Sequence, residues 1–320
     1  MTDTAAPTGP TAVSASTPVA DAHRDLRDRL VAAGRLVPTG VDGIYGRDEM
    51  FESVVTGFDR LVSAAGADAD PTRVEYPPMI PKVNFDRIGY LRNFPELVGP
   101  IFSFVGDAAA HRGVLDRLDA GDDYSDLLTQ SELALTPACC YSVYPSVGPR
   151  IAKGGRTFET CGYCFRHEPS VDPMRLQAFR QREHIRVATP DEVLAWRDRW
   201  LERAPELLSS LGLDVVSDVA NDPFFGRAGR LMKMSQREQQ LKIEFLVDVY
   251  GPEHRTACSS INYHQDHFGH LFDITTADGE TAHSSCIGFG FERATVAMFQ
   301  RHGMDTAGWP SNVRDRLGLG

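Results

Sequence analysis

The chain has 320 residues, 42% of them hydrophobic, and is long enough to bury a large core, which we expect to form a single domain. The formal net charge of -11 gives no general attraction to a polyanion, so any phosphate or nucleic-acid site has to be local. No stretch approaches the roughly 20 apolar residues that span a bilayer, and the start lacks the basic and apolar regions of a signal peptide. We therefore expect a cytoplasmic protein without a membrane partner.

The first half of the chain combines a polar tail, two helices and a proline-rich segment. Residues 1–20 are mainly Ala, Thr, Ser and Pro, which predicts a disordered tail before one folded domain over 21–320. Apolar residues recur at helical spacing in 25–37 and 49–65, which predicts two helices packed on a sheet. The segment 71–96 contains too many prolines for a long helix, so we expect a strand and an extended crossing segment.

The second half of the chain alternates strands with two helices. Thr189 and Pro190 open a predicted helix that closes near Gly212, and a second apolar helix is expected at 290–301 after a turn at 277–279. Consecutive strands with helices at the ends favour an α+β fold with an antiparallel sheet. The predicted strands lie at 131–144, 157–166, 179–188, 242–250, 255–263 and 270–276.

Six cysteines without a secretion signal indicate free thiols or metal ligands rather than a disulfide framework. The Cys161-x-x-Cys164 pair is typical of zinc knuckles and of redox dithiols alike. A zinc ribbon needs a second close pair, and a redox pair normally opens a helix, so we favour two half-buried strand cysteines. Adjacent Cys139 and Cys140 would point to opposite faces if they lay on a strand.

Two segments have the composition of an anion site. Around the loop after Phe165, Arg166 and Arg175 are placed to meet phosphates, Glu168 to accept from an exocyclic amine, and Phe179 to stack on a base. The alternative interpretation is a solvated charged hairpin. Near the C-terminus, two glycines precede Arg293 at a strand-to-helix transition, where small residues admit a ligand and the helix start favours anions. That spacing matches neither the Walker nor the Rossmann loop.

Together these segments resemble motifs 2 and 3 of the class II aminoacyl-tRNA synthetases, and residues 76–78 resemble the motif 1 proline at the dimer interface. The sequences LTPACCYSVYP, FETCGYCFRHE, FRQREH, DPFFGRAGR and HSSCIGFGFERA are similar to the amino acid:[carrier protein] ligases. These ligases are relatives of the atypical zinc-dependent seryl-tRNA synthetases, and the resemblance covers about residues 45–315.

The resemblance implies a class II synthetase-like antiparallel sheet flanked by helices, forming one catalytic domain over 21–320. It implies Zn²⁺ held by Cys140, Glu183 and Cys286, with Cys139 as the alternative sulfur and Glu183 also in the substrate site. Two thiolates and a carboxylate leave zinc a fourth position, which an amino acid's α-amine can fill. The residues implied around ATP are Arg166, Glu168, Arg175, Leu176, Phe179, Lys242, Ala257, Cys258, Ser259, Ser260 and Arg293, with Glu244 for Mg²⁺ and with Arg166 and Arg293 catalytic.

The implied reaction is ATP-dependent activation of a small amino acid, glycine or alanine, followed by transfer to the phosphopantetheine thiol of a carrier protein. The resemblance also implies a homodimer. We expect no tRNA substrate, because no sustained heptads or basic stripe precede residue 70. Candidate docking surfaces for an acidic carrier protein are 227–237 and the helix from 189 with Arg197, Arg199 and Arg203. The alternatives are tRNA aminoacylation, as by a seryl-tRNA synthetase, and a non-catalytic zinc or nucleotide-binding module.

Overall fold

The computed structural model of the protein describes residues 18–220 and 239–320. Within these ranges the main element is a seven-stranded sheet in which all neighbouring strands are antiparallel except one parallel pair at an edge, β3 with β7. This confirms the predicted α+β class and its antiparallel sheet. The strands, in spatial order, are β3 (Thr72–Arg73), β7 (Arg156–Phe165), β8 (Ala178–Ala188), β12 (His283–Gly290), β11 (Thr256–Gln265), β10 (Lys242–Val247) and β9 (Val215–Val219).

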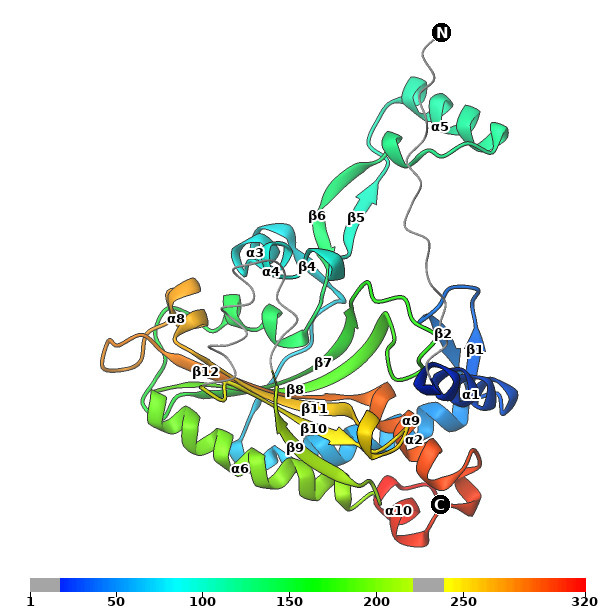
Figure 1. The fold of residues 1–320 in the computed structure, drawn as a ribbon. Helices are drawn as coiled ribbons and strands as arrows, with labels where there is room; N and C mark the ends of the chain where they lie inside the picture. Colours follow the sequence, from blue (N-terminus) through cyan, green and yellow to red (C-terminus); the bar gives the residue numbers. More distant parts are fainter. Residues whose placement is uncertain (1–17, 221–238) are drawn as a thin grey trace.

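Three helices cover one face of this sheet (Figure 1): α2 (Glu49–Ala65), α6 (Pro190–Ser209) and α9 (Phe291–His302). They build the larger hydrophobic core, in which the Phe289 ring of β12 packs edge-on against Phe58 of α2 at 6.2 Å. The predicted start of α6 is confirmed, because Thr189 and Glu192 form a capping box there.

The N-terminal helix begins earlier and ends earlier than predicted. Helix α1 (Pro18–Ala32) includes the last residues assigned to the tail, and the remainder of the predicted tail, 1–17, lies outside the described residues. The chain then forms the small hairpin of β1 (Leu36–Pro38) and β2 (Tyr45–Arg47), so the predicted helix over 25–37 is wrong beyond Ala32. Gly34 ends the helix because it adopts a positive φ of 76°.

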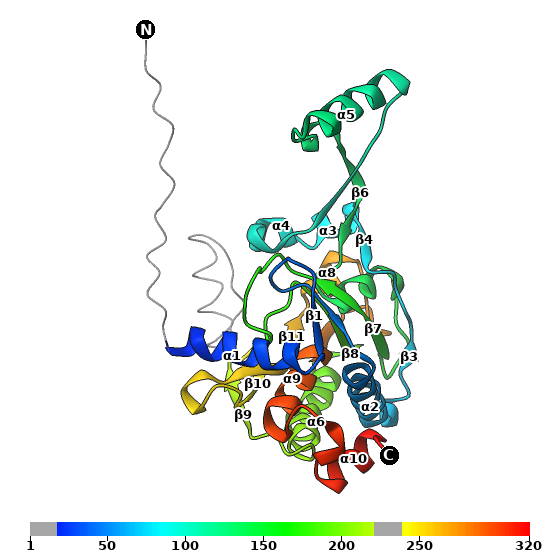
Figure 2. The ribbon, with the colours of Figure 1, turned by 90° about the vertical axis from the view of Figure 1, so that its right-hand side faces the viewer.

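A smaller layer lies over the other face of the main sheet. The proline-rich segment contains no long helix, as predicted, but it forms two short ones that pack into a second hydrophobic core with Tyr144 and Phe268. Helix α5 (Ala108–Ala120) stands away from the body (Figure 2), and none of its residues is buried. The elements of this layer are β4 (Met79–Pro81), α3 (Lys82–Arg87), α4 (Tyr90–Asn93), β5 (Pro100–Ser103), α5 (Ala108–Ala120) and β6 (Thr129–Leu135).

Two predicted strands are wrong in part. The expected strand at 270–276 begins inside the short helix α8 (His267–Leu271), because Phe268, Leu271 and Phe272 recur at helical spacing and pack into the second core. The rest of it forms only isolated bridges at Thr275. In the expected strand at 131–144, only β6 is extended. After Pro137, which cannot donate to a strand ladder, residues Cys139–Ser142 form a 3₁₀ turn, η4.

The C-terminal helix α10 (Ser311–Leu317) packs on α2. Of the helices described, none combines the length and the apolar content required to cross a bilayer.

The contact between α10 and α2 depends on a glycine. A Cβ added at Gly57 would lie 2.2 Å from the Leu317 carbonyl oxygen, whereas a Cβ at Gly113 of α5 would meet nothing within 4 Å. We predict that Gly57→Ala lowers the free energy of unfolding by about 1–3 kcal/mol through overpacking. Gly113→Ala should leave it unchanged or raise it by up to about 1 kcal/mol. Urea denaturation of both variants is the measurement, and equal midpoints would contradict this account of the contact.

Candidate active site

Side chains of β8 alternate between the two faces of the sheet. Arg182 pairs with Asp59 of α2, and the His184 ring stacks on Trp200 of α6 at 5.1 Å, so this set faces the helices. The opposite set, Phe179, Gln181 and Glu183, lines a cavity of about 530 Å³. The rest of its lining comes mainly from β10, β11, β12, η4, α4, α8, the start of α9 and the segment after β7.

The cavity brings together the two arginines singled out from distant motifs. Arg166 and Arg293 both line it. The Arg166 Nε donates to the Pro137 carbonyl oxygen at 3.1 Å, and its guanidinium lies 5.4 Å from the centre of the Phe179 ring. The Arg293 Nε donates to the Met174 oxygen at 2.7 Å. Burial, together with the positive charges of Arg166 and Arg175, lowers the pKa of Arg293.

Most of the other residues expected around a nucleotide also line this cavity. Arg175 and Leu176 do not: the exposed Arg175 side chain pairs with Glu168 at 2.8 Å, and Leu176 is buried. Glu244, expected near magnesium, lines the cavity and pairs with Lys242 at 3.0 Å. The expected residues that do line it, beside the two arginines, are Glu168, Phe179, Lys242, Ala257, Cys258, Ser259 and Ser260.

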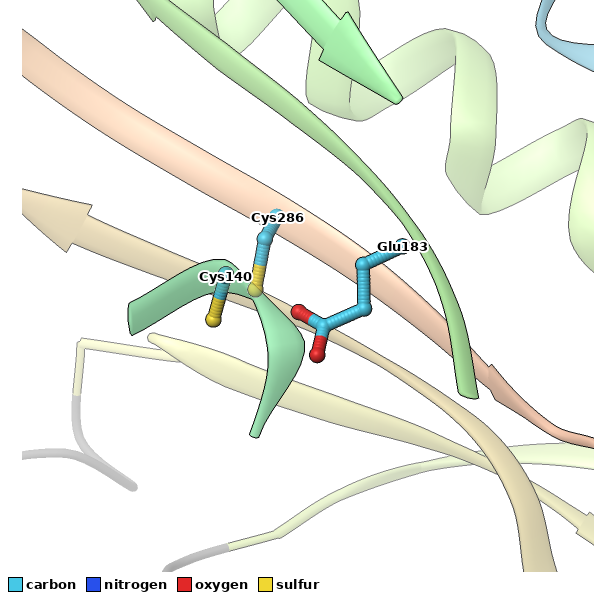
Figure 3. A group of neighbouring side chains, drawn as sticks. All are labelled: Cys140, Glu183 and Cys286. Atoms are coloured by element: carbon cyan, nitrogen blue, oxygen red, sulfur yellow. The ribbon is translucent and has the colours of Figure 1, made fainter. Parts of the chain in front are cut away.

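Cys140, Glu183 and Cys286 converge at the wall of the cavity from η4, β8 and β12 (Figure 3). One ligand atom of each lies within 4.8 Å of the others, and all three residues are buried. Burial raises the pKa of Glu183. The hydrogen bond with Cys286, together with burial, raises the pKa of Cys140. Three groups that are anionic when ionised thus lie together in a buried place, and their donor atoms could hold a divalent cation.

The 3₁₀ turn η4 separates the two adjacent cysteines. The Cys139 Sγ points away from the cluster, to the Cys164 Sγ at 3.5 Å and to the Gly162 oxygen at 3.4 Å. Its backbone N–H donates to the Glu183 carboxylate at 2.8 Å. Cys140 is therefore the sulfur of this pair that faces Glu183 and Cys286.

Cys161 and Cys164 do not form a joint site. They are three residues apart on β7, so they point to opposite faces. Cys161 packs against the larger core, whereas Cys164 contacts Cys139. The pair is accordingly neither a metal knuckle nor a dithiol pair, in agreement with the strand interpretation.

Sequence reasoning missed several residues of the cavity. Gln181 lies on the strand face shared by Phe179 and Glu183, and Asn262 and His264 continue the alternation that begins at Ser260 of β11. The two-residue period was the signal that indicated these positions. Tyr90 and Phe94, from the proline-rich segment, had no comparable signal.

The first proposed docking surface, 227–237, lies outside the described residues. In the second, on α6, two of the three arginines are bonded within the chain. The Arg197 guanidinium donates to the Gln240 oxygen at 2.6 Å, and that of Arg203 pairs with Asp68 at 2.7 Å. Of these three arginines, Arg199 is the one for which the described residues provide no such bond.

Comparison with known proteins gives close relatives over nearly the whole chain. The chain is 41% identical over 306 residues to amino acid–[acyl-carrier-protein] ligase 1 of Bradyrhizobium diazoefficiens, covering 94% of this chain and 91% of that protein. It belongs to the amino acid–[acyl-carrier-protein] ligase family. Ligase 2 of the same organism is 42% identical over 284 residues, covering 88% and 84% of the two chains. Membership of this family makes the chain a ligase. A separate scan against protein-family models found no match.

More distant relatives confirm the class II synthetase fold of this ligase. The type-2 serine–tRNA ligase of Methanopyrus kandleri is 26% identical over 57% of this chain and 37% of its own length. Its structure in complex with tRNASec superposes with a TM-score of 0.79 at 20% identity, covering 92% of this chain and 60% of that one. The structure of the Pyrococcus horikoshii seryl-tRNA synthetase complexed with ATP superposes with a TM-score of 0.67 at 16% identity, covering 92% of this chain and 62% of that one. The ligase thus spans about three fifths of these synthetase chains.

The burial of the thiols predicts their reactivity. Cys161 is half-buried and the other five cysteines are buried, and burial raises the pKa of Cys161 to about 11. With an aromatic disulfide reagent, we expect only the Cys161 thiol to react in the native protein, and to react slowly. Its rate should rise about tenfold for each unit of pH increase, as long as the pH stays below that pKa. All six should react in denaturant. Cys161→Ser should abolish the native reaction. Rapid reaction of several native thiols would contradict the burial described.

Proposed function

We propose that this ligase activates a small amino acid, glycine or alanine, with ATP and transfers it to the phosphopantetheine thiol of a carrier protein. The observation that carries the proposal is that one cavity joins Arg166 and Arg293 to the cluster of Cys140, Glu183 and Cys286. The names of the Bradyrhizobium relatives support the amino acid and the carrier protein as substrates.

The arginine end of the cavity suits a nucleotide triphosphate. Arg166 and Arg293 donate to backbone carbonyl oxygens at 3.1 and 2.7 Å, bonds that phosphate oxygens can replace with a gain in charge pairing. In the first step the amino acid carboxylate attacks the α-phosphorus and pyrophosphate leaves. Fixed positive charge stabilises the charge that develops there. Glu244 would help to hold Mg²⁺, and the seryl-tRNA synthetase structures containing ATP or AMP support this nucleotide class.

The cluster end of the cavity suits the amine of the substrate. Two sulfurs and one carboxylate within 4.8 Å fit the donor set of Zn²⁺, which when bound offers a fourth position to a neutral amine. Glu183 is held in place by the Cys139 N–H, so its carboxylate is oriented before any ligand arrives. Selection by the amine favours α-amino acids as a class, while the remaining wall excludes bulky side chains.

The second step transfers the activated acyl group. The phosphopantetheine sulfur attacks the carbonyl carbon of the adenylate, its proton is lost, AMP leaves and a thioester forms. Aminoacylation of tRNA is the second candidate, favoured by the sequence similarity to serine–tRNA ligases. The homodimer expected from the class II resemblance stays a prediction, which analytical ultracentrifugation can test.

Pyrophosphate exchange tested across the amino acids examines the first step, and thioester formation on a phosphopantetheinylated carrier protein examines the second. We expect exchange with glycine or alanine, and acyl transfer to the carrier but not to tRNA. Arg293→Ala should reduce exchange by about a hundredfold or more, because a charge facing the phosphates is lost. The matched control Arg112→Ala, on the exposed helix α5, should leave exchange unchanged. Absence of exchange with every amino acid would refute the proposal, and charging of tRNA would favour the second candidate.

Bound metal distinguishes the two adjacent cysteines. We expect the purified protein to contain about one zinc per chain. Cys140→Ser and Cys286→Ala should lose it, because each removes a sulfur from the cluster. Cys139→Ser should keep it, because that side chain points to Cys164. The measurement is elemental analysis of the purified variants. Loss of zinc from Cys139→Ser, with retention in Cys140→Ser, would reverse the assignment.

A further inference from the structure

His264 occupies an irregular position in the sheet beside the Cys/Glu/Cys cluster. The pairing of β11 with β12 shifts register between Tyr263 and Gln265, so His264 lies in a β-bulge without a Cα partner on β12. The next residue, Gln265, has a positive φ of 54°, which is uncommon for a residue with a side chain. Bulges near active sites commonly redirect one side chain. The His264 ring lines the cavity next to Cys286.

Both ring nitrogens of His264 have polar neighbours. The Nε2 lies 3.7 Å from the Cys286 Sγ, within hydrogen-bonding range for sulfur. The Nδ1 lies 3.2 Å from the Tyr144 hydroxyl and 3.3 Å from the Ser284 hydroxyl. The ring also packs edge-on against Phe268 at 4.9 Å. The imidazole is thus fixed by polar contacts at both nitrogens and by an aromatic face.

These contacts decide which nitrogen carries the hydrogen when a metal is held. A metal-bound thiolate can only accept a hydrogen bond, so the Nε2 facing Cys286 has to be the N–H. The Nδ1 then accepts from a hydroxyl, and Tyr144 and Ser284 both present one. Asn262, whose amide nitrogen lies 4.0 Å from the same sulfur, is a more distant second donor.

We infer that His264 is a positioning residue that donates a hydrogen bond to the Cys286 sulfur and thereby orients and tunes the metal cluster; this inference rests on the zinc site of the proposed function. The bond fixes the direction of the sulfur and withdraws charge from it. Weaker donation by that sulfur leaves more positive charge at the metal for the incoming amine. Partners of this kind typically change metal affinity by about 10–100-fold.

The experiment compares metal binding in four variants of the full chain. His264→Phe keeps an aromatic ring and removes the N–H donor. His264→Gln keeps an N–H donor, on an amide instead of a ring. Tyr144→Phe removes one hydroxyl that faces Nδ1. The matched control is His267→Phe, another histidine of the cavity wall, for which the described contact is with Phe268. Zinc affinity is measured by competition with a chromogenic chelator, and the sulfur-to-metal charge-transfer band is recorded after substitution with Co²⁺.

His264→Phe should weaken zinc binding about 10–100-fold, because the sulfur is no longer held in its direction. It should also move the cobalt band to lower energy, because the sulfur becomes a stronger donor. His264→Gln should recover part of both changes, Tyr144→Phe should show a smaller change in the same direction, and His267→Phe should show none. Circular dichroism checks that each variant is folded.

Three results would overturn the inference. Unchanged affinity and band in folded His264→Phe would refute the hydrogen bond while leaving the zinc site intact. A wild-type cobalt spectrum that a small amino acid cannot alter would point instead to His264 as a fourth ligand. No metal binding by the wild-type chain would refute the proposed zinc site and this inference together.

Discussion

The two-residue alternation of β8 is the constraint on which the rest of the structure depends. One strand supplies a charged set to the helices and a different set to the cavity. Because the strand pairs with β7 on one side and β12 on the other, a slip of one residue would exchange the two sets. The ion pairs of Arg180 and Arg182 with α2 on one face, and the packing of Ile185 and Val187 in the second core on the other, hold the register and therefore also position Glu183.

The two faces differ in how their arginines are neutralised. Toward the helices, Arg180 meets the carboxylates of Glu52 at 2.6 Å and of Glu292 at 2.8 Å, and Arg182 meets that of Glu159 at 2.5 Å. In these pairs the arginine charges are neutralised by carboxylates of the same chain, so they stabilise the fold and are not available to a ligand. Toward the cavity, Arg166 and Arg293 donate to backbone carbonyl oxygens, which are neutral. The same residue type thus serves structure on one face and, under the proposed function, phosphate binding on the other.

Sequence reasoning succeeded where local pattern and chemistry agreed. The capping box at Thr189 and the alternation around Phe179 and Glu183 are local features, and both recur in the structure. The convergence of Cys140 with Cys286 came from family resemblance, since no spacing rule connects residues so far apart. The helix at 267–271 was missed because a short apolar run satisfies both periods. His264 follows Asn262 at the same two-residue spacing, but the sequence does not reveal the β-bulge in which it lies.

The turn η4 makes two parts of the cluster depend on each other. A single stretch of chain presents the Cys140 sulfur and, from the preceding residue, the N–H that holds the Glu183 carboxylate. Changes at the turn and at Glu183 should therefore not add, since either one releases both groups. The backbone N–H of Cys139 thus fixes the geometry of the cluster as firmly as the side chains do.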